Sequence, residues 1–214
     1  MTTEANKMTC QLYSVRDARK LRSERRPQEV LDAARRIFSR LGYAAASVEE
    51  IAKEAGMAKG TIYVHFKSKE EVFATVLVGD LDYLTNLMIE GMSAATTFQE
   101  RLTVFLNQRL PDPQRNKDFV RICFAEFESL GSHCALSSHG IDKLFVRGVD
   151  FMRQCLERAI AEGELRAVPV EPAALAIFAL ARGFFERHLR GWTHLTLEED
   201  VAFTRSLIMD GLRK

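Results

Sequence analysis

The sequence predicts an all-α protein in which a small three-helix head is joined by a long helix to a larger helical bundle. Apolar residues recur at helical spacing along most of the chain, and the alternation of polar and apolar residues that marks a β-strand is not found. Two S-x-x-E sequences, which begin at Ser47 and Ser68, have the form of a capping box and so mark helix starts. Glycine and proline residues separate the remaining helical segments.

The first helix of the head is expected from Pro27, a residue that favours the first turn, to Gly42. Its apolar residues recur at helical spacing: Val30, Ala34, Ile37, Phe38 and Leu41. Residues 1–25 lack this spacing and are rich in arginine, so we expect a basic arm that is partly disordered. Such an arm could lie along a nucleic-acid backbone, and a solvated tail is the equal alternative.

The second helix of the head is expected to begin after Ser47 and to end at Gly56. Ser47 and Glu50 form its capping box. Its apolar residues share one face: Val48, Ile51, Ala52 and Ala55. Gly56 suits the left-handed conformation that commonly ends a helix, and Met57 and Ala58 then make a short turn.

The third helix, expected over residues 59–66, has one face suited to a packed core and an opposite face suited to DNA. Ile62 and Phe66 fall together and point back to the second helix. The opposite face consists of three small residues: Gly60, Thr61 and Val64. Tyr63 and His65 flank this slim, almost uncharged ridge, which fits a major groove about 12 Å wide. The three helices are therefore interpreted as a helix-turn-helix, homeodomain-like head.

The stretch from Pro27 to Leu77 resembles the DNA-binding domain of the TetR family of bacterial transcriptional regulators. The run GMAKGTIYVHFKSKEEVF carries the resemblance, with its turn glycine, G-T-I-Y core, aromatic-His-Phe ending and the lysine that opens the next helix. The resemblance implies a set of residues that face the groove: Lys59, Gly60, Thr61 and Val64. It also implies a set that contacts the DNA backbone: Ser47, Tyr63, His65 and Lys69. Lys67, at the joint with the next helix, is also placed to reach phosphate.

One position departs from some members of the family. Where a basic residue sometimes reads a base, this chain has Glu49, so the resemblance does not indicate an operator sequence. Taken singly, Tyr63 or His65 would more often be an ordinary residue of a helix that faces solvent, and Lys67 and Lys69 could be an ordinary solvated charge pair. The agreement of the whole set favours DNA binding.

The helix that follows the head is expected from Lys69 to Glu90, about 33 Å at 1.5 Å per residue. Such a helix is long enough to start beside the third helix and to end in a second domain. Further helices are expected at residues 97–109, 115–130, 138–162, 171–191 and 197–213. The predicted domains are a basic arm (1–25), a DNA-binding domain (26–70) and a ligand-binding and dimerisation domain (71–214).

The formal net charge of +1 conceals a segregation of charge along the chain. Residues 1–70 carry 14 Lys and Arg against 9 Asp and Glu, a net +5, whereas the remaining residues carry 16 against 20, a net −4. The amino-terminal third is therefore the part suited to a polyanion such as DNA.

The last two helices carry more apolar residues than one buried face requires. Phe184 and Phe185 are adjacent and so cover more than one face of their helix. The family resemblance implies that these two helices form a four-helix dimer interface, which would place two recognition helices against a two-fold operator. A well-packed core within one chain is the alternative.

The middle of the chain is rich in aromatic residues. Most of these are expected in the core, but the resemblance implies a pocket for a small apolar or amphipathic effector. The candidate ligand-binding residues are Phe105, Phe124, Glu126, Phe127, Phe151, Phe178 and Arg182. Glu126 could instead lie at a helix edge in water, and Arg182 raises the same question.

Several classes of protein are disfavoured by the composition. The four cysteines show no zinc spacing, and Cys134, despite His133 and His139 nearby, is not expected to bind a metal. No cofactor is expected. The longest apolar run, residues 173–181, is too short to span a membrane, and no signal peptide is evident, so a cytoplasmic protein is predicted.

The sequence therefore predicts a cytoplasmic, homodimeric transcriptional regulator, a repressor that binds a palindromic operator and is released by a small effector. An enzyme or ligand carrier is disfavoured because no nucleophile–base pair, Glu-x-x-His pair or phosphate-binding glycine loop is evident. A DNA-organising or scaffold protein with the same head and no effector remains an alternative.

Overall fold

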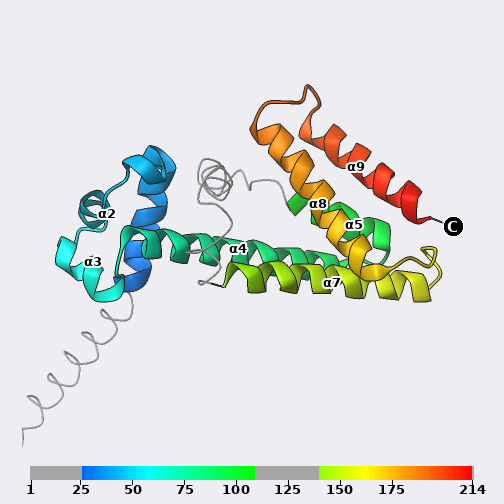
Figure 1. Ribbon diagram of the computed structural model, residues 1–214, viewed down its shortest axis with the longest axis horizontal. Helices are drawn as coiled ribbons and strands as arrows, with labels where there is room; N and C mark the ends of the chain where they lie inside the picture. The colour runs from blue at the N-terminus through cyan, green and yellow to red at the C-terminus, as the bar shows by residue number, and fades with distance from the viewer. Residues whose placement is uncertain (1–25, 109–139, 214) are drawn as a thin grey trace, which may run out of the picture. The chain divides into compact units, whose positions relative to one another are not determined.

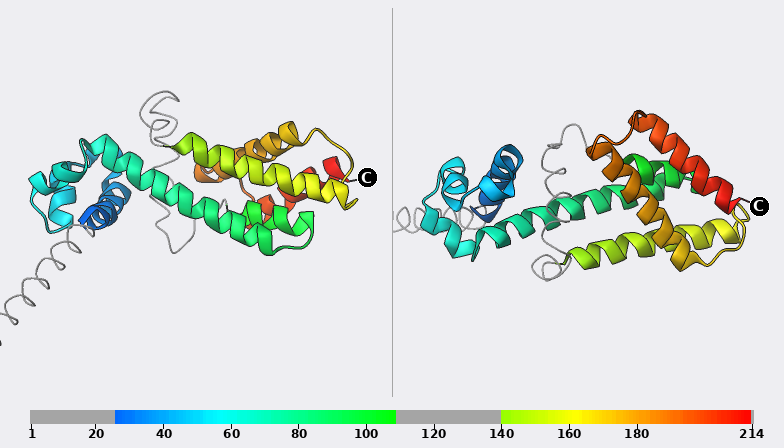
Figure 2. Two further views of the ribbon diagram at one scale, coloured as in Figure 1. Left: turned by 90° about the horizontal axis from the view of Figure 1, so that it is seen from below. Right: turned by 45° about the horizontal axis from the view of Figure 1, so that its top comes forward.

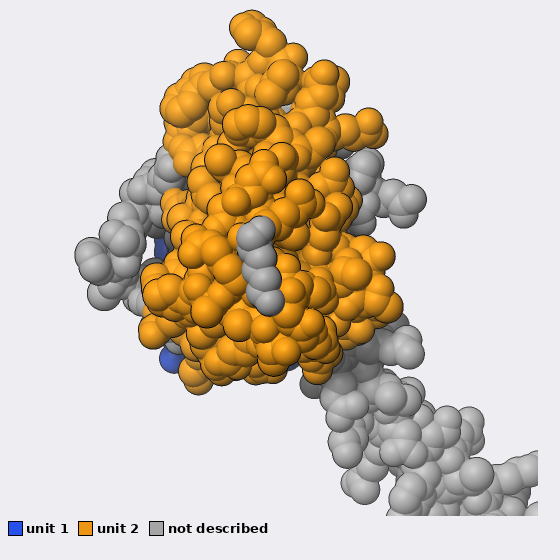
Figure 3. Space-filling view, turned by 90° about the vertical axis from the view of Figure 1, so that its right-hand side faces the viewer, with its two compact units in different colours: residues 1–76 blue, residues 77–214 orange. Residues whose placement is uncertain are grey.

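The computed structural model describes residues 26–108 and 140–213, and every regular element in these ranges is an α-helix (Figure 1). The predicted all-α class is confirmed. The chain divides into two compact units, Met1–Val76 and Leu77–Lys214, which Figure 3 colours separately. The division falls within α4, Lys69–Ala94, so one helix begins in the first unit and ends in the second.

The first unit contains the three predicted helices of the head and the start of α4. The first helix covers residues 26–45, and it is followed by α2, Val48–Glu54, and α3, Lys59–His65. Gly42, where the first helix was expected to end, has the left-handed φ of 78°, but helical structure continues to residue 45. Gly56 ends α2 as predicted, with a φ of 65°.

The core of the first unit is built from one apolar face of each helix. Its buried side chains include Val30, Ala34, Ile37, Phe38, Val48, Ile51, Ala52, Ile62, Phe66, Val72 and Phe73. The rings of Phe38 and Phe73 meet edge to face, with their centroids 5.1 Å apart, and Tyr43 packs against both. Leu41, expected among the core residues, is exposed because it lies one residue before the chain turns at Gly42.

The start of α4 differs in one detail from the predicted capping box. The Ser68 hydroxyl accepts a hydrogen bond from the backbone N–H of Glu71, as a capping box requires. The Glu71 carboxylate, however, accepts from the backbone N–H of Lys67 rather than from that of Ser68. Both bonds satisfy backbone donors near the helix start, so α4 is still capped at the predicted place.

The second unit contains the rest of α4 together with α5, Phe98–Gln108, α7, Ile141–Ala161, α8, Val170–Leu189, and α9, Leu197–Leu212. These bounds lie within a few residues of the predicted ones, and α4 extends four residues beyond Glu90. α8 crosses α7, and α9 lies beside α8 and α5 (Figures 1 and 2). The helix expected over residues 115–130 lies outside the described residues.

Two glycines allow neighbouring helices to pack closely in the second unit. A side chain at Gly91 of α4 would lie 2.8 Å from both the Gln108 amide nitrogen and a Val104 methyl group of α5. A side chain at Gly148 of α7 would lie 3.1 Å from the ring of Phe178. Both positions therefore favour glycine because of what packs against them.

The pair formed by α8 and α9 is held by a buried ionic contact and by aromatic packing. The Arg187 guanidinium binds the buried carboxylate of Asp200 and lies over the ring of Phe184, 4.9 Å from its centroid. Phe184 in turn meets Phe203 of α9, while Phe185 is buried in the core. The adjacent phenylalanines do cover two faces of α8, and one of these faces is completed by α9.

α4 is long and apolar enough to cross a membrane by length and composition alone. This is weak evidence for a span, because the core helix of a globular protein passes the same test. Asp80 and Asp82 lie in the middle of the helix, where an ionised side chain would be costly in lipid.

Candidate nucleic-acid interface

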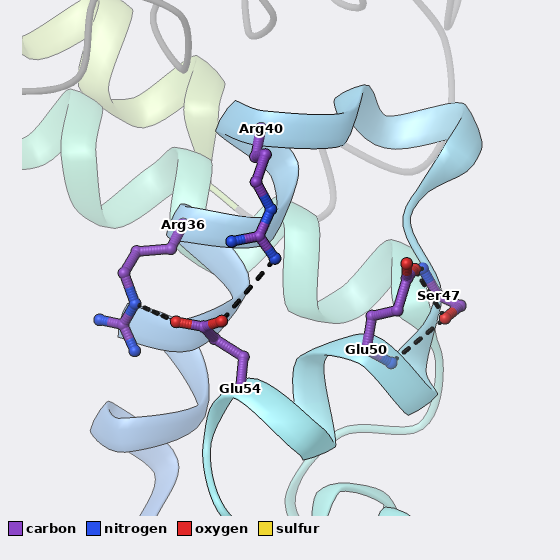
Figure 4. A network of polar contacts seen from close by, with 5 residues as sticks. All are labelled: Arg36, Arg40, Ser47, Glu50 and Glu54. Atoms are coloured by element: carbon purple, nitrogen blue, oxygen red, sulfur yellow. Dashed lines mark hydrogen bonds and ion pairs between the residues drawn. The ribbon is translucent and has the colours of Figure 1, made fainter.

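Ser47 caps the amino terminus of α2 through the predicted capping box (Figure 4). Its hydroxyl accepts a hydrogen bond from the backbone N–H of Glu50 at 3.2 Å. The Glu50 carboxylate accepts in return from the backbone N–H of Ser47 and from its hydroxyl, both at 2.9 Å. Ser47 therefore fixes where α2 begins, and the contact with DNA backbone assigned to it remains a prediction.

A second contact attaches the far end of α2 to the first helix. The Glu54 carboxylate accepts a hydrogen bond from Arg36 at 2.7 Å and lies 3.7 Å from Arg40 (Figure 4). The bond from Arg36 lowers the pKa of Glu54. This ion pair joins the end of α2 to the first helix, whereas the capping box fixes where α2 begins.

α3 buries one face and exposes the other, as its sequence pattern predicts. Ile62 is buried, and so is Phe66, which follows the helix as its carboxyl-terminal cap. On the other face Val64 is 77% exposed and Tyr63 is 48% exposed, with Gly60 exposed and Thr61 half-buried beside them. The result is a narrow ridge of small side chains on the outside of the head.

Gly60 has no reason within the described structure to be glycine. Its φ is not in the left-handed region, and a side chain there would meet nothing within 4 Å. Glycine inside a helix costs about 0.5–1 kcal/mol relative to alanine. A requirement for close approach by another molecule would explain its presence.

Lys59, the first residue of α3, is not free on the surface. Its ammonium donates a hydrogen bond to the carboxylate of Glu49 in α2, and it lies 5.8 Å from the centroid of the Tyr63 ring. The bond to Lys59 lowers the pKa of Glu49, and the bond to Glu49 raises the pKa of Lys59. Both groups therefore keep their charge at neutral pH.

Lys69 has internal partners that the sequence pattern did not indicate. Its ammonium donates hydrogen bonds to the backbone carbonyls of Tyr43, at 2.9 Å, and Ala46, at 3.0 Å. It also lies over the ring of Tyr43, 4.3 Å from the centroid, and the Tyr43 hydroxyl donates to Glu70. Two of the three ammonium donors are thus used within the head, which leaves one for the predicted phosphate contact.

The remaining predicted contacts lie at the carboxyl end of α3. His65 is half-buried in its last turn, and Lys67 is exposed in the joint that leads to α4. Within the described residues, the Lys67 ammonium donates no hydrogen bond, so it can bind an external anion. The sequence did not predict that Glu49 pairs with Lys59 or that Tyr43 contacts Lys69. No short spacing along the chain links the two residues of either pair.

Comparison with known proteins decides the family. Residues 30–76, which contain α2, α3 and the start of α4, match the family model described as "Bacterial regulatory proteins, tetR family". The chain belongs to the TetR family. This TetR-family protein is therefore a DNA-binding transcriptional regulator, as the resemblance of its head implied.

Relatives that match over most of the chain agree with this assignment. The HTH-type transcriptional regulator AcrR of Shigella flexneri is 27% identical over 183 residues, 82% of each chain. FadR of Bacillus subtilis, solved in complex with stearoyl-CoA, aligns with a TM-score of 0.71 at 22% identity, covering 86% of this chain and 98% of that one. A regulator from Saccharomonospora viridis, solved with choline, gives a TM-score of 0.77 at 18% identity, covering 88% and 97%. All three are named as transcriptional regulators, and the two structural alignments show that the fold is shared over most of the chain.

The candidate ligand-binding residues of this TetR-family regulator are only partly brought together. Phe105 and Phe178 are both buried, with ring centroids 4.8 Å apart, and Phe151 packs at the edge of the same core. Arg182 is exposed on α8. Phe124, Glu126 and Phe127 lie outside the described residues, as do Cys134, His133 and His139. The assignment of a ligand to this core remains a prediction.

Proposed function

We propose that this regulator binds a palindromic operator as a homodimer, that α3 of each copy enters the major groove, and that a small amphipathic effector releases the DNA. The observation that carries the proposal is the exposed ridge of α3, where Gly60 and Val64 present a helix backbone without bulky or charged side chains. A major groove about 12 Å wide admits such a helix. Lys67 and Tyr63 lie beside the ridge, where they would reach phosphates.

The proposal of a dimer rests on α8 and α9. Apolar side chains on the outer surface of these helices are exposed in the single chain: Leu175, Phe203 and Leu207. Phe203 and Leu207 are four residues apart and so share one face of α9. A second copy packed against this face would remove the side chains from water and create the two-fold symmetry that a palindrome requires.

The proposal of an amphipathic effector rests on the core around Phe105 and Phe178. These aromatic rings offer an apolar environment suited to an acyl chain or a similar group. FadR of Bacillus subtilis, which has the same fold, was solved with stearoyl-CoA, so long acyl thioesters are the first compounds to test. A coupling of about 1–3 kcal/mol between effector and operator would weaken DNA binding about 5- to 150-fold. We infer that the protein acts in the cytoplasm, where bacterial DNA is found.

The docking of α3 is tested by a carboxylate placed on its ridge. Val64→Glu should lower the affinity for a selected operator at least 100-fold, because the new charge would face both the bases and the phosphates. Val146→Glu is a matched control, since Val146 is 62% exposed on α7 and lies in the other unit. Affinity is measured by fluorescence anisotropy, and circular dichroism checks that both variants fold. Equal affinities for Val64→Glu and the unaltered protein would refute the docking.

A further inference from the structure

The ion pair between Glu49 and Lys59 connects the two helices of the helix-turn-helix at its outer surface. Glu49 is the second residue of α2 and Lys59 is the first residue of α3. Both side chains are about half exposed, at 60% and 48%, although they are bound to each other. The ring of Tyr63, one turn further along α3, lies near the same ammonium. An acceptor and a donor are thus held side by side at the start of the recognition helix.

The rest of the exposed ridge offers little hydrogen bonding to a base. Gly60 and Val64 carry no side-chain donor or acceptor, and the single hydroxyl of the ridge belongs to Thr61, which is half-buried. DNA sequence is read mainly by hydrogen bonds and apolar contacts to base edges, whereas phosphate contacts only position the protein. The Glu49–Lys59 pair is therefore well placed to supply polar readout beside this ridge.

The chemistry of the pair matches one kind of base pair. In the major groove, guanine presents two acceptors, O6 and N7, to which lysine donates, and cytosine presents the N4 amino group, which a carboxylate accepts. We propose that Lys59 and Glu49 together read one G·C base pair in each half-site, with Lys59 on guanine and Glu49 on cytosine. This inference rests on the proposed docking of α3 in the major groove.

The charge of Glu49 also disfavours binding to operators of the wrong sequence. A carboxylate close to DNA is repelled by the phosphates and gains a compensating hydrogen bond only where a base offers a donor. Lys59 offsets part of this repulsion because the two charges are paired. Glu49 should therefore lower the affinity for operators that lack cytosine at this position more than for those that have it.

A purely structural explanation of Glu49 makes a different prediction. An acidic residue in the first turn of α2 interacts favourably with the helix dipole, as Glu50 also does. If that were its whole purpose, removing the carboxylate would lower the stability of the head slightly and leave base preference unchanged. The two explanations are therefore separated by measuring preference and stability on the same variants.

The experiment uses the full chain and one operator obtained by selection, with every base pair of a half-site replaced in turn. Fluorescence anisotropy gives the affinity of the unaltered protein, Glu49→Ala and Lys59→Met for each replacement. The control is Glu54→Ala, which removes another carboxylate of α2 that pairs with Arg36 and Arg40 of the first helix rather than with α3 (Figure 4). Thermal melts followed by circular dichroism confirm that each variant folds.

The unaltered protein should prefer G·C about 5- to 150-fold at one base pair of the half-site. Glu49→Ala and Lys59→Met should each reduce this preference at the same base pair, and Glu49→Ala should bind the replaced operators more tightly than the unaltered protein does. Glu54→Ala should keep the full preference.

Two results would overturn the inference while leaving the proposed function intact. In one, Glu49→Ala keeps the full preference of the unaltered protein. In the other, the Glu49 and Lys59 variants change preference at different base pairs. A protein that shows no preference at any base pair would instead refute the proposed function, and this inference with it.

Discussion

Replacing Lys69 by methionine separates its structural role from its predicted role on DNA. The substitution removes the hydrogen bonds to the carbonyls of Tyr43 and Ala46 and the contact with the Tyr43 ring, while the methionine retains much of the apolar stem. A hydrogen bond from a charged group contributes about 1.5–3 kcal/mol, and a cation–π contact about 0.5–2 kcal/mol. Because Lys69 is only half-buried, water replaces part of these interactions, and we expect the free energy of unfolding to fall by about 2–4 kcal/mol.

The measurement has two parts, performed on Lys69→Met and on Lys67→Met as a matched control. Urea denaturation followed by far-ultraviolet circular dichroism gives the free energy of unfolding, which should fall for Lys69→Met and change by less than about 0.5 kcal/mol for Lys67→Met. The salt dependence of operator affinity gives the number of phosphate contacts, since each contributes about 0.9 to the logarithmic slope. We expect the slope to fall by about 0.9 for each variant, because each loses one predicted phosphate contact, so that only the unfolding free energy distinguishes Lys69→Met from Lys67→Met. An unchanged unfolding free energy together with a reduced slope for Lys69→Met would refute the structural role and favour a pure phosphate contact.

Three further predictions concern packing, assembly and pH. Gly91→Ala should lower the free energy of unfolding by about 1–3 kcal/mol because its side chain would collide with α5, whereas Gly79→Ala on the same helix has open space and should raise it by about 0.5–1 kcal/mol. Urea denaturation that finds Gly91→Ala more stable than Gly79→Ala would contradict this packing. Leu207 is 49% exposed on α9, in the face proposed to form the dimer, so Leu207→Glu should sediment as a monomer, while the unaltered protein and Val146→Glu should sediment as the proposed dimer. A Leu207→Glu protein that remains dimeric would exclude this face. Hydrogen bonds from Thr96 and Thr97 lower the pKa of Glu100 to about 2 from its usual 4.5, so the stability that its carboxylate gives α5 is present above pH 4.5 and is lost as the pH falls toward 2. The melting temperature of Glu100→Gln should therefore fall less over this pH range than that of the unaltered protein, and an equal fall in both proteins would contradict this role of Glu100.

The features that sequence reasoning predicted well are those encoded by neighbouring residues. The cap of α2 depends on Ser47 and Glu50, three residues apart, and the burial of Ile62 and Phe66 follows from their spacing of four. Such signals give the helix order and the face of α3 that points outward. Helix ends are less well defined, since α4 continues to Ala94 although its apolar pattern weakens after Glu90.

The features that sequence reasoning missed depend on residues brought together by folding. The carbonyls bound by Lys69 belong to residues 23 and 26 positions earlier, and Glu49 lies 10 positions before Lys59. No helical period links such positions, so their contacts follow only from the packing of three helices. The same reason applies to Arg187 and Asp200, which belong to different helices and meet in the second unit.

The most direct test of the account is selection of DNA from a random pool by the purified full-length protein. A dimer with α3 of each copy in the major groove predicts enrichment of one palindromic sequence, whose half-sites are separated by about one helical turn or a multiple of it. The Val64→Glu protein should enrich nothing under the same conditions. Enrichment of a single unrepeated site, or binding that depends on salt but enriches no sequence, would contradict the claim that a two-fold pair of α3 helices reads an operator.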